Sequence, residues 1–142
     1  MEYRETIGNV VLNTEDYPGR DLYSDGEIED VLLDIAKNTD PRDFDKVVEE
    51  RESWPVMYHF STIRTNIMSW MPIDRSMKVL EIGSGCGAIT GTIAEKAGSV
   101  TCVELSRKRS LINAWRNREK DNIEIRLGNF EDVEKKLETD YD

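Results

Sequence analysis

Residue types that bind metals or form disulfides are scarce in this chain. Its 142 residues include two cysteines, Cys86 and Cys102, and a single histidine, His59. A structural zinc site needs four such ligands, so we expect no metal site. We interpret the cysteines as buried or loop thiols in a reducing compartment, and a disulfide between them stays open as an alternative.

Long hydrophobic runs are also missing. No stretch approaches the roughly 20 consecutive apolar residues of a membrane span. The first residues, MEYRETIGNVVLN, lack the continuous apolar region of a signal peptide. We therefore expect a cytoplasmic protein without a membrane partner. The hydrophobic fraction of 38% is sufficient for one domain with one core.

Positive charge is lacking in the first part of the chain. Residues 1–60 contain 16 acidic and 6 basic side chains, whereas residues 61–142 contain 13 of each, so the first part accounts for the net charge of −10. An acidic surface repels phosphate backbones, so this part of the chain is a poor candidate for the main nucleic-acid contact. A solvated helical face is the simpler explanation of these carboxylates.

The first 76 residues read as a mainly helical leader with a short strand. Residues 7–12 have the composition of a strand, which could form a hairpin with residues 21–23 around a turn at Pro18-Gly19. Ser24-Asp25-Gly26-Glu27 matches a capping box. The helix after it should bury one apolar stripe, made of Ile28, Val31, Leu32 and Ile35.

Two further helices are predicted in this leader. Asp40-Pro41 is a start signal for a helix that should run to about Glu52. A third helix should lie between Pro55 and Met71 and carry large apolar side chains: Met57, Tyr58, Phe60, Ile63, Ile67, Met68 and Trp70. We expect the three tryptophans, Trp54, Trp70 and Trp115, to be core anchors rather than substrate platforms.

From residue 77 onward, strands and helices alternate. The short apolar run at residues 78–82 is typical of a buried parallel strand, and residues 100–104 and 123–127 read as a second and a third strand. Helices are predicted at residues 88–97, after a cap at Ser106, and briefly from about Glu131. This alternation predicts an α/β fold with an open parallel sheet.

A glycine cluster follows the first of these strands, in the sequence Glu81-Ile82-Gly83-Ser84-Gly85-Cys86-Gly87. Glycine lets a backbone approach a ligand closely. Gly83, Gly85 and Ala88 also satisfy a dinucleotide pattern, which is weak by itself. Glu81 favours a ligand with a cationic amino group over a pyrophosphate, and Gly87 would leave room for an adenosyl group.

VLEIGSGCGAIT resembles motif I of class I S-adenosylmethionine-dependent methyltransferases, which have a Rossmann-like fold. The resemblance implies that Glu104 accepts hydrogen bonds from both ribose hydroxyls, that Asn129 holds the adenine edge and that Phe130 packs on the adenine face. Cys86 is expected to fill space rather than to react. The implied cofactor is S-adenosylmethionine, with S-adenosylhomocysteine as product, bound by Glu81, Gly83, Ser84, Gly85, Cys86, Gly87, Glu104, Leu105, Asn129 and Phe130.

The leader is similar to leaders of bacterial methyltransferases associated with glycosyltransferases, which cover the cofactor. Its polar candidates are Tyr58, His59, Ser61 and Arg64, and Arg64 could pair with the methionyl carboxylate. For each of them a packing role is the stronger interpretation. No residue is identified as catalytic, and the methyl acceptor cannot be read from the sequence.

The resemblance implies a leader at residues 1–76 and the cofactor half of a methyltransferase domain at residues 77–142, with only the first three strands of its sheet. We expect such a fragment to be inactive by itself. One edge of residues 79–82 should then be exposed, and self-association or the N-terminal segment should cover it. A non-catalytic binding or interaction module is the alternative function.

Overall fold

The computed structural model describes residues 2–142 as an α/β fold, which confirms the predicted fold class. Five strands form one sheet in the order β1-β2-β5-β4-β3. The strands β2, β5, β4 and β3 run parallel, and β1 pairs antiparallel with β2. Their bounds are β1 Arg4–Ile7, β2 Val10–Asp16, β3 Lys78–Ile82, β4 Ser99–Glu104 and β5 Ile123–Gly128.

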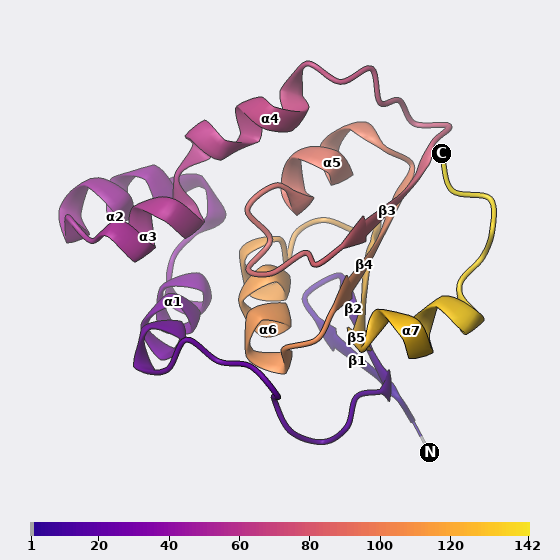
Figure 1. The fold of residues 1–142 in the computed structure, drawn as a ribbon. Helices are drawn as coiled ribbons and strands as arrows, with labels where there is room; N and C mark the ends of the chain where they lie inside the picture. Colours follow the sequence, from indigo (N-terminus) through magenta and orange to yellow (C-terminus); the bar gives the residue numbers. More distant parts are fainter. Residues whose placement is uncertain (1) are drawn as a thin grey trace.

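Helices cover both faces of this sheet. In Figure 1, α5 and α6 lie on one face, the leader helices lie beyond them, and α7 lies on the other face. None of the helices in residues 2–142 is long and apolar enough to cross a membrane. The helices are α1 Glu27–Asn38, α2 Phe44–Arg51, α3 Trp54–Phe60, α4 Asn66–Ser69, α5 Thr90–Lys96, α6 Arg107–Arg116 and α7 Phe130–Val133, with short 3-10 turns at Pro41–Asp43, Thr62–Thr65 and Glu134–Lys136.

Two hydrophobic clusters meet at α6. The first joins the sheet to α5 and α6, and includes Val100, Ile125 and Ala114. The second joins α6 to the leader helices through Ile112 and the stacked rings of Phe44 and Phe60, whose centroids are 4.9 Å apart. Helix α6 therefore fixes the leader relative to the sheet.

The leader hairpin differs from the prediction. Its turn lies at Gly8-Asn9 between β1 and β2, and not at Pro18-Gly19. Gly8 has a φ of 56°, and a Cβ there would lie 2.4 Å from the carbonyl oxygen of Arg118. Glycine is thus required by both the turn and the close approach of the two chain segments. The strand predicted over residues 7–12 is interrupted by this turn, because Ile7 ends β1 and residues 10–12 begin β2.

The predicted capping box is also wrong. Helix α1 begins after Gly26, whose φ of 80° suits glycine, and it has no side-chain cap. The Ser24 hydroxyl instead accepts from the Gly26 amide and donates to Glu29. The buried stripe is shifted accordingly, because Glu29, Leu32, Ile35 and Ala36 are buried whereas Val31 is exposed.

Other start signals are confirmed. Asp40 accepts a hydrogen bond from the Arg42 amide and precedes Pro41, as expected for the start of the second helical segment. That segment begins as a 3-10 turn and continues into α2. Ser106 caps α6 by accepting from the Arg109 amide.

The third leader helix is broken where a continuous helix was predicted. Ser61 adopts an extended conformation with ψ 133°, which ends α3 and starts the turn at Thr62–Thr65. Several apolar side chains of this region point into solvent. Trp54 is 66% exposed and Trp70 is 75% exposed, so neither is a core anchor, whereas the partly buried Trp115 packs against the second cluster.

Strand β3 has one open edge over most of its length. Its strand partner within residues 2–142 is β4 alone. Asp142 covers only the start of the strand: its amide donates to the Lys78 carbonyl, and its side-chain carboxylate accepts from the Lys78 amide, each at 2.9 Å. Cover by strand addition from residues 10–12 is wrong, because these residues belong to β2, which lies beside β5.

We expect this edge to drive self-association, because unpaired strand edges template further pairing and Ile82 is 56% exposed. Light scattering at micromolar concentration should give a dimer or a larger mass. Ile82→Lys, which places a charge on the edge, should return the chain toward a monomer. A wild-type monomer with rapid amide exchange over residues 79–82 would contradict this prediction.

Candidate functional site

The glycine cluster forms an open loop at the carboxyl end of β3. Gly83 and Gly85 have φ values of 72° and 56°, in the left-handed region that favours glycine. A Cβ built on either residue would meet no atom within 4 Å. The loop therefore presents bare backbone to open space, as a site for close ligand approach requires.

A cavity of about 380 Å³ lies between this loop and the leader. Its volume falls within the roughly 300–1,000 Å³ of small-molecule sites. The loop side contributes Glu81, Gly83, Ser84, Gly85 and Cys86. The other lining residues are Asp25, Trp54, Tyr58, His59, Arg64, Ala88, Ile89 and Arg109.

Glu81 reaches this cavity with one carboxylate oxygen already occupied. Oε1 accepts from the Thr90 hydroxyl at 2.6 Å and from the Cys102 thiol at 3.7 Å. No hydrogen bond from residues 2–142 ends on Oε2. Burial raises the pKa of Glu81, the two hydrogen bonds oppose that rise, and the negative charge of Glu104 adds to it.

Ser84 carries a second free group in the loop. It is buried, and its hydroxyl has no hydrogen-bond partner among the described residues. The hydroxyl oxygen lies inside the loop, near the Cys102 thiol, rather than at the cavity surface.

The two cysteines are buried and unpaired with each other. Cys86 is 4% exposed and packs in the second cluster, and burial raises the pKa of its thiol to about 12. Such a thiol is protonated at neutral pH and unreactive. These properties support the space-filling role expected for Cys86.

Gly87 faces away from this cavity. A Cβ there would lie 2.3 Å from Oδ1 of Asn113 on α6, and its φ is 78°. The structure thus gives Gly87 a packing reason to be glycine. It lies instead on the wall of a second cavity, described below.

Glu104 lies beside the loop rather than on the cavity wall. One oxygen accepts from the Gly85 amide at 2.7 Å and the other from the Ser106 amide at 3.0 Å. The side chain is 8% exposed. Each carboxylate oxygen keeps a further lone pair, so a diol could still be accepted.

The remaining predicted contacts follow the next two strands. Leu105 is partly buried after β4. Asn129 is exposed and caps α7 by accepting from the Glu131 amide at 3.2 Å, and the partly buried Phe130 begins that helix. None of the three lines the cavity described above.

The leader brings an aromatic and basic group to the cavity. Tyr58 stacks on Trp54 with ring centroids 5.0 Å apart, and the Arg64 guanidinium lies 4.3 Å from the Tyr58 ring centroid. Burial lowers the pKa of His59, and nearby arginines lower it further. Both effects favour the neutral imidazole.

Sequence reasoning missed Asp25 and Arg109. Arg109 pairs with buried Glu29 at 2.7 Å and with Asp25 at 2.6 Å, and Asp25 and Arg109 both line the cavity. From the sequence, Asp25 falls in the predicted capping box and the other leader carboxylates fall on a solvated face. Residues 107–109 are three consecutive basic residues. This run is the sequence signal that could have indicated partners for the acidic residues near the start of α1.

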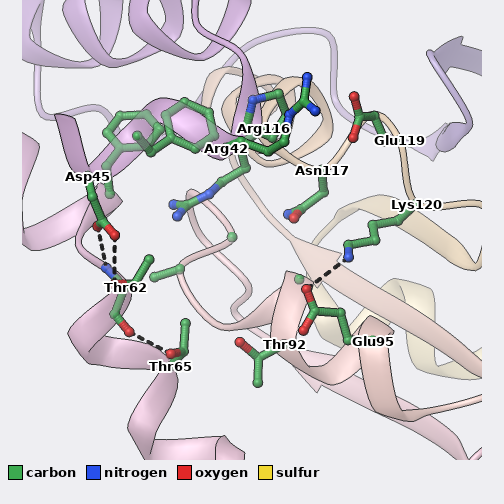
Figure 2. A pocket seen from close by; sticks show the side chains of 16 residues that line it. Arg42, Asp45, Thr62, Thr65, Thr92, Glu95, Arg116, Asn117, Glu119 and Lys120 are labelled. Carbon is green, nitrogen blue, oxygen red and sulfur yellow. Dashed lines mark hydrogen bonds and ion pairs between the residues drawn. The ribbon is translucent and has the colours of Figure 1, made fainter. Parts of the chain in front are cut away.

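A second cavity, of about 280 Å³, lies between the leader, α5 and the end of α6. Figure 2 shows that its wall combines leader residues such as Arg42 and Thr62 with Glu95 of α5 and residues at the end of α6. Lys120 pairs with Glu95 at 3.0 Å there. Within residues 2–142 no group of three or more acidic, histidine or cysteine side chains could hold a metal ion.

Comparison with known proteins matches residues 61–139, just over half of the chain, to the family of ribosomal RNA adenine dimethylases. Over 65 residues the chain is 35% identical to ribosomal RNA small subunit methyltransferase A of Streptococcus equi subspecies zooepidemicus, and 37% identical to the enzyme of that name from Streptococcus uberis. These alignments cover 46% of this chain and 22% of each relative.

Among solved structures, the chain is similar to a Haemonchus contortus phosphoethanolamine N-methyltransferase, with 25% identity and a TM-score of 0.47 over 76% of this chain and 24% of that one. The family match confirms the recognition of a class I methyltransferase, with S-adenosylmethionine as its cofactor. The chain belongs to the ribosomal RNA adenine dimethylase family of S-adenosylmethionine-dependent methyltransferases.

Proposed function

We propose that this chain is the cofactor-binding half of an enzyme that transfers a methyl group from S-adenosylmethionine. The observation that carries the proposal is the open glycine loop at the end of β3, beside a carboxylate with one free oxygen. A cationic amino group fits that oxygen, and the bare backbone of Gly83 and Gly85 admits a ligand without a side-chain clash.

The residues present fit the cofactor. Glu81 Oε2 would accept from its ammonium group, since Oε1 alone is occupied by Thr90 and Cys102. Arg64, on the opposite wall, would pair with its carboxylate. When bound, the cofactor supplies an electrophilic methyl group on its sulfonium, and the chain contributes binding and orientation.

The adenosine end would extend past the cavity toward the ends of β4 and β5. There Glu104 would accept from the ribose hydroxyls while it still holds the Gly85 amide. Asn129 would bond the adenine edge, and Phe130 would pack on its face. Leu105 would complete this apolar wall.

For the acceptor, we propose an adenine base of RNA. The family match supports this choice, as do the curated relatives, whose names specify small-subunit ribosomal RNA. The balanced charge of residues 61–142 is compatible with RNA, whereas residues 1–60 would have to face away from it.

A second candidate is an acceptor other than nucleic acid. The net charge of −10 favours it, because the leader carries an excess of carboxylates and lies on the cofactor side of α6. An uncharged or cationic acceptor would approach this face without repulsion.

Transfer of radiolabel from S-adenosylmethionine tests both candidates. The chain, and the longer polypeptide if its reading frame continues, would be incubated with small-subunit RNA and separately with a small-molecule extract. Label in RNA that disappears on Glu104→Ala supports the first candidate. Label confined to the extract supports the second. If the longer polypeptide labels neither acceptor, methyl transfer is contradicted and a non-catalytic binding module is the remaining interpretation.

A further inference from the structure

A line of hydrogen bonds leads from Glu81 into the interface between α5 and α6. The Thr90 hydroxyl donates to Glu81 Oε1 at 2.6 Å, Asn113 Nδ2 donates to Thr90 Oγ1 at 3.2 Å, and Asn117 Nδ2 donates to Asn113 Oδ1 at 2.8 Å. Thr90 and Asn113 are fully buried, and Asn117 is 8% exposed. The line ends at the second cavity, whose wall includes Asn117 (Figure 2).

Two glycines make room for these asparagines. A Cβ at Gly87 would lie 2.3 Å from Asn113 Oδ1, and a Cβ at Gly91 would lie 2.5 Å from Asn117 Oδ1. Helix α5 and the loop before it are thus shaped around two buried amides. Apolar side chains would fill the same interface without the need to satisfy every donor and acceptor. This interface therefore points to a role beyond packing.

We propose that Thr90, Asn113 and Asn117 are positioning residues that hold Glu81 ionised, with Oε2 turned to the cofactor. The proposal rests on the function proposed above. An amide nitrogen can only donate, so Asn113 Nδ2 occupies a lone pair of the Thr90 oxygen. The Thr90 proton is then directed to Glu81 Oε1, and this hydrogen bond favours the ionised form because it is stronger when the acceptor is a carboxylate. Asn117 fixes the orientation of the Asn113 amide in the same way.

The hydrogen bond from Thr90 opposes the effects of the other groups around Glu81 on its pKa. Burial and the charge of Glu104 both favour the protonated form, and Cys102 shares Oε1 with Thr90. The charged or titratable groups that face it across the cavity are Asp25, His59, Arg64 and Arg109. Loss of the Thr90 hydrogen bond should therefore raise the pKa of Glu81.

The test is an NMR titration of the Glu81 side-chain carboxyl in the 142-residue chain, with Glu81→Gln to assign the signal. Thr90→Val keeps the shape but removes the hydroxyl, and should raise the pKa by about one unit. Thr90→Ser keeps the hydroxyl and should restore the wild-type value. Asn113→Ala should raise the pKa of Glu81 by less than Thr90→Val does. If Thr90→Val does not fold, the shift in Asn113→Ala is the test of the proposal.

Ser110→Ala is the matched control. Ser110 is a fully buried hydroxyl on α6 that bonds only its own helix, through the Ser106 carbonyl. If Ser110→Ala shifts the Glu81 pKa as much as Asn113→Ala, or if Thr90→Val and Thr90→Ser titrate alike, the proposal is overturned.

Calorimetry with S-adenosylhomocysteine separates this proposal from the function on which it rests. The affinity should fall as the pH drops through the Glu81 pKa, and Thr90→Val should move that midpoint upward by the same shift. Failure of the wild-type chain to bind, with the NMR shifts intact, would overturn the proposed function and leave the positioning roles standing.

Discussion

Replacement of Glu104 by alanine is expected to weaken S-adenosylhomocysteine binding at least tenfold. The substitution would remove the proposed acceptor for both ribose hydroxyls, and each such charge-assisted bond is worth about 1.5–3 kcal/mol. It also frees the Gly85 and Ser106 amides, which Glu104 now holds at 2.7 and 3.0 Å. Isothermal titration calorimetry measures the loss directly.

A 2′-deoxy analogue of the ligand separates these two effects. Wild type should bind the analogue more weakly than the parent ligand, whereas Glu104→Ala should not distinguish them, because the hydroxyl has already lost its partner. If the alanine variant binds with unchanged affinity, the ribose is held elsewhere.

Gly87→Ala is expected to destabilise the fold by about 3 kcal/mol. A left-handed backbone costs a non-glycine residue about 1–2 kcal/mol, and displacement of a buried, hydrogen-bonded amide adds a similar amount. Both terms apply at this position, where φ is 78° and Asn113 Oδ1 would lie 2.3 Å from the new methyl group. Urea denaturation measures the change in the free energy of unfolding.

Gly85→Ala is the matched comparison in the same loop. Its φ of 56° carries the backbone cost, but its Cβ would meet no atom within 4 Å. We expect a loss of only about 1 kcal/mol of stability, together with weaker ligand binding, because Gly85 lines the cavity. If the two substitutions destabilise the fold equally, the methyl group at position 87 does not displace the Asn113 amide.

The second half of the fold could be predicted from sequence because its signals are local. The parallel strands at residues 78–82, 100–104 and 123–127 are short segments rich in β-branched apolar residues, and the structure places β3, β4 and β5 there within one residue. The Ser106 cap follows from side-chain chemistry alone.

The leader was harder because its conformation depends on distant contacts. The turn at Gly8 is fixed by its approach to Arg118, which lies 110 residues further along the chain. The break at Ser61 interrupts an apolar run that otherwise suits one helix. Trp54 and Trp70 are exposed because the described chain offers no surface to bury them, which side-chain size alone does not reveal.

The candidate site also has a part that could be predicted from local sequence and a part that could not. Glu81 and the Gly83–Cys86 loop were predicted from the motif, and the structure brings them to one cavity with Tyr58, His59 and Arg64. The line from Thr90 to Asn117 could not be predicted, because it joins the facing sides of two helices whose relative rotation no local pattern specifies. The four-residue spacing of Gly87 and Gly91 is explained only by the structure, in which these glycines face Asn113 and Asn117.

The most direct test of the central claim is calorimetric titration of the 142-residue chain with S-adenosylhomocysteine and, separately, with NAD. A glycine loop beside the Glu81 carboxylate should favour the ligand with a cationic amino group and disfavour a pyrophosphate. We predict saturable binding of S-adenosylhomocysteine, weakened by Glu81→Gln, and no binding of NAD. Tighter binding of NAD than of S-adenosylhomocysteine would contradict the account.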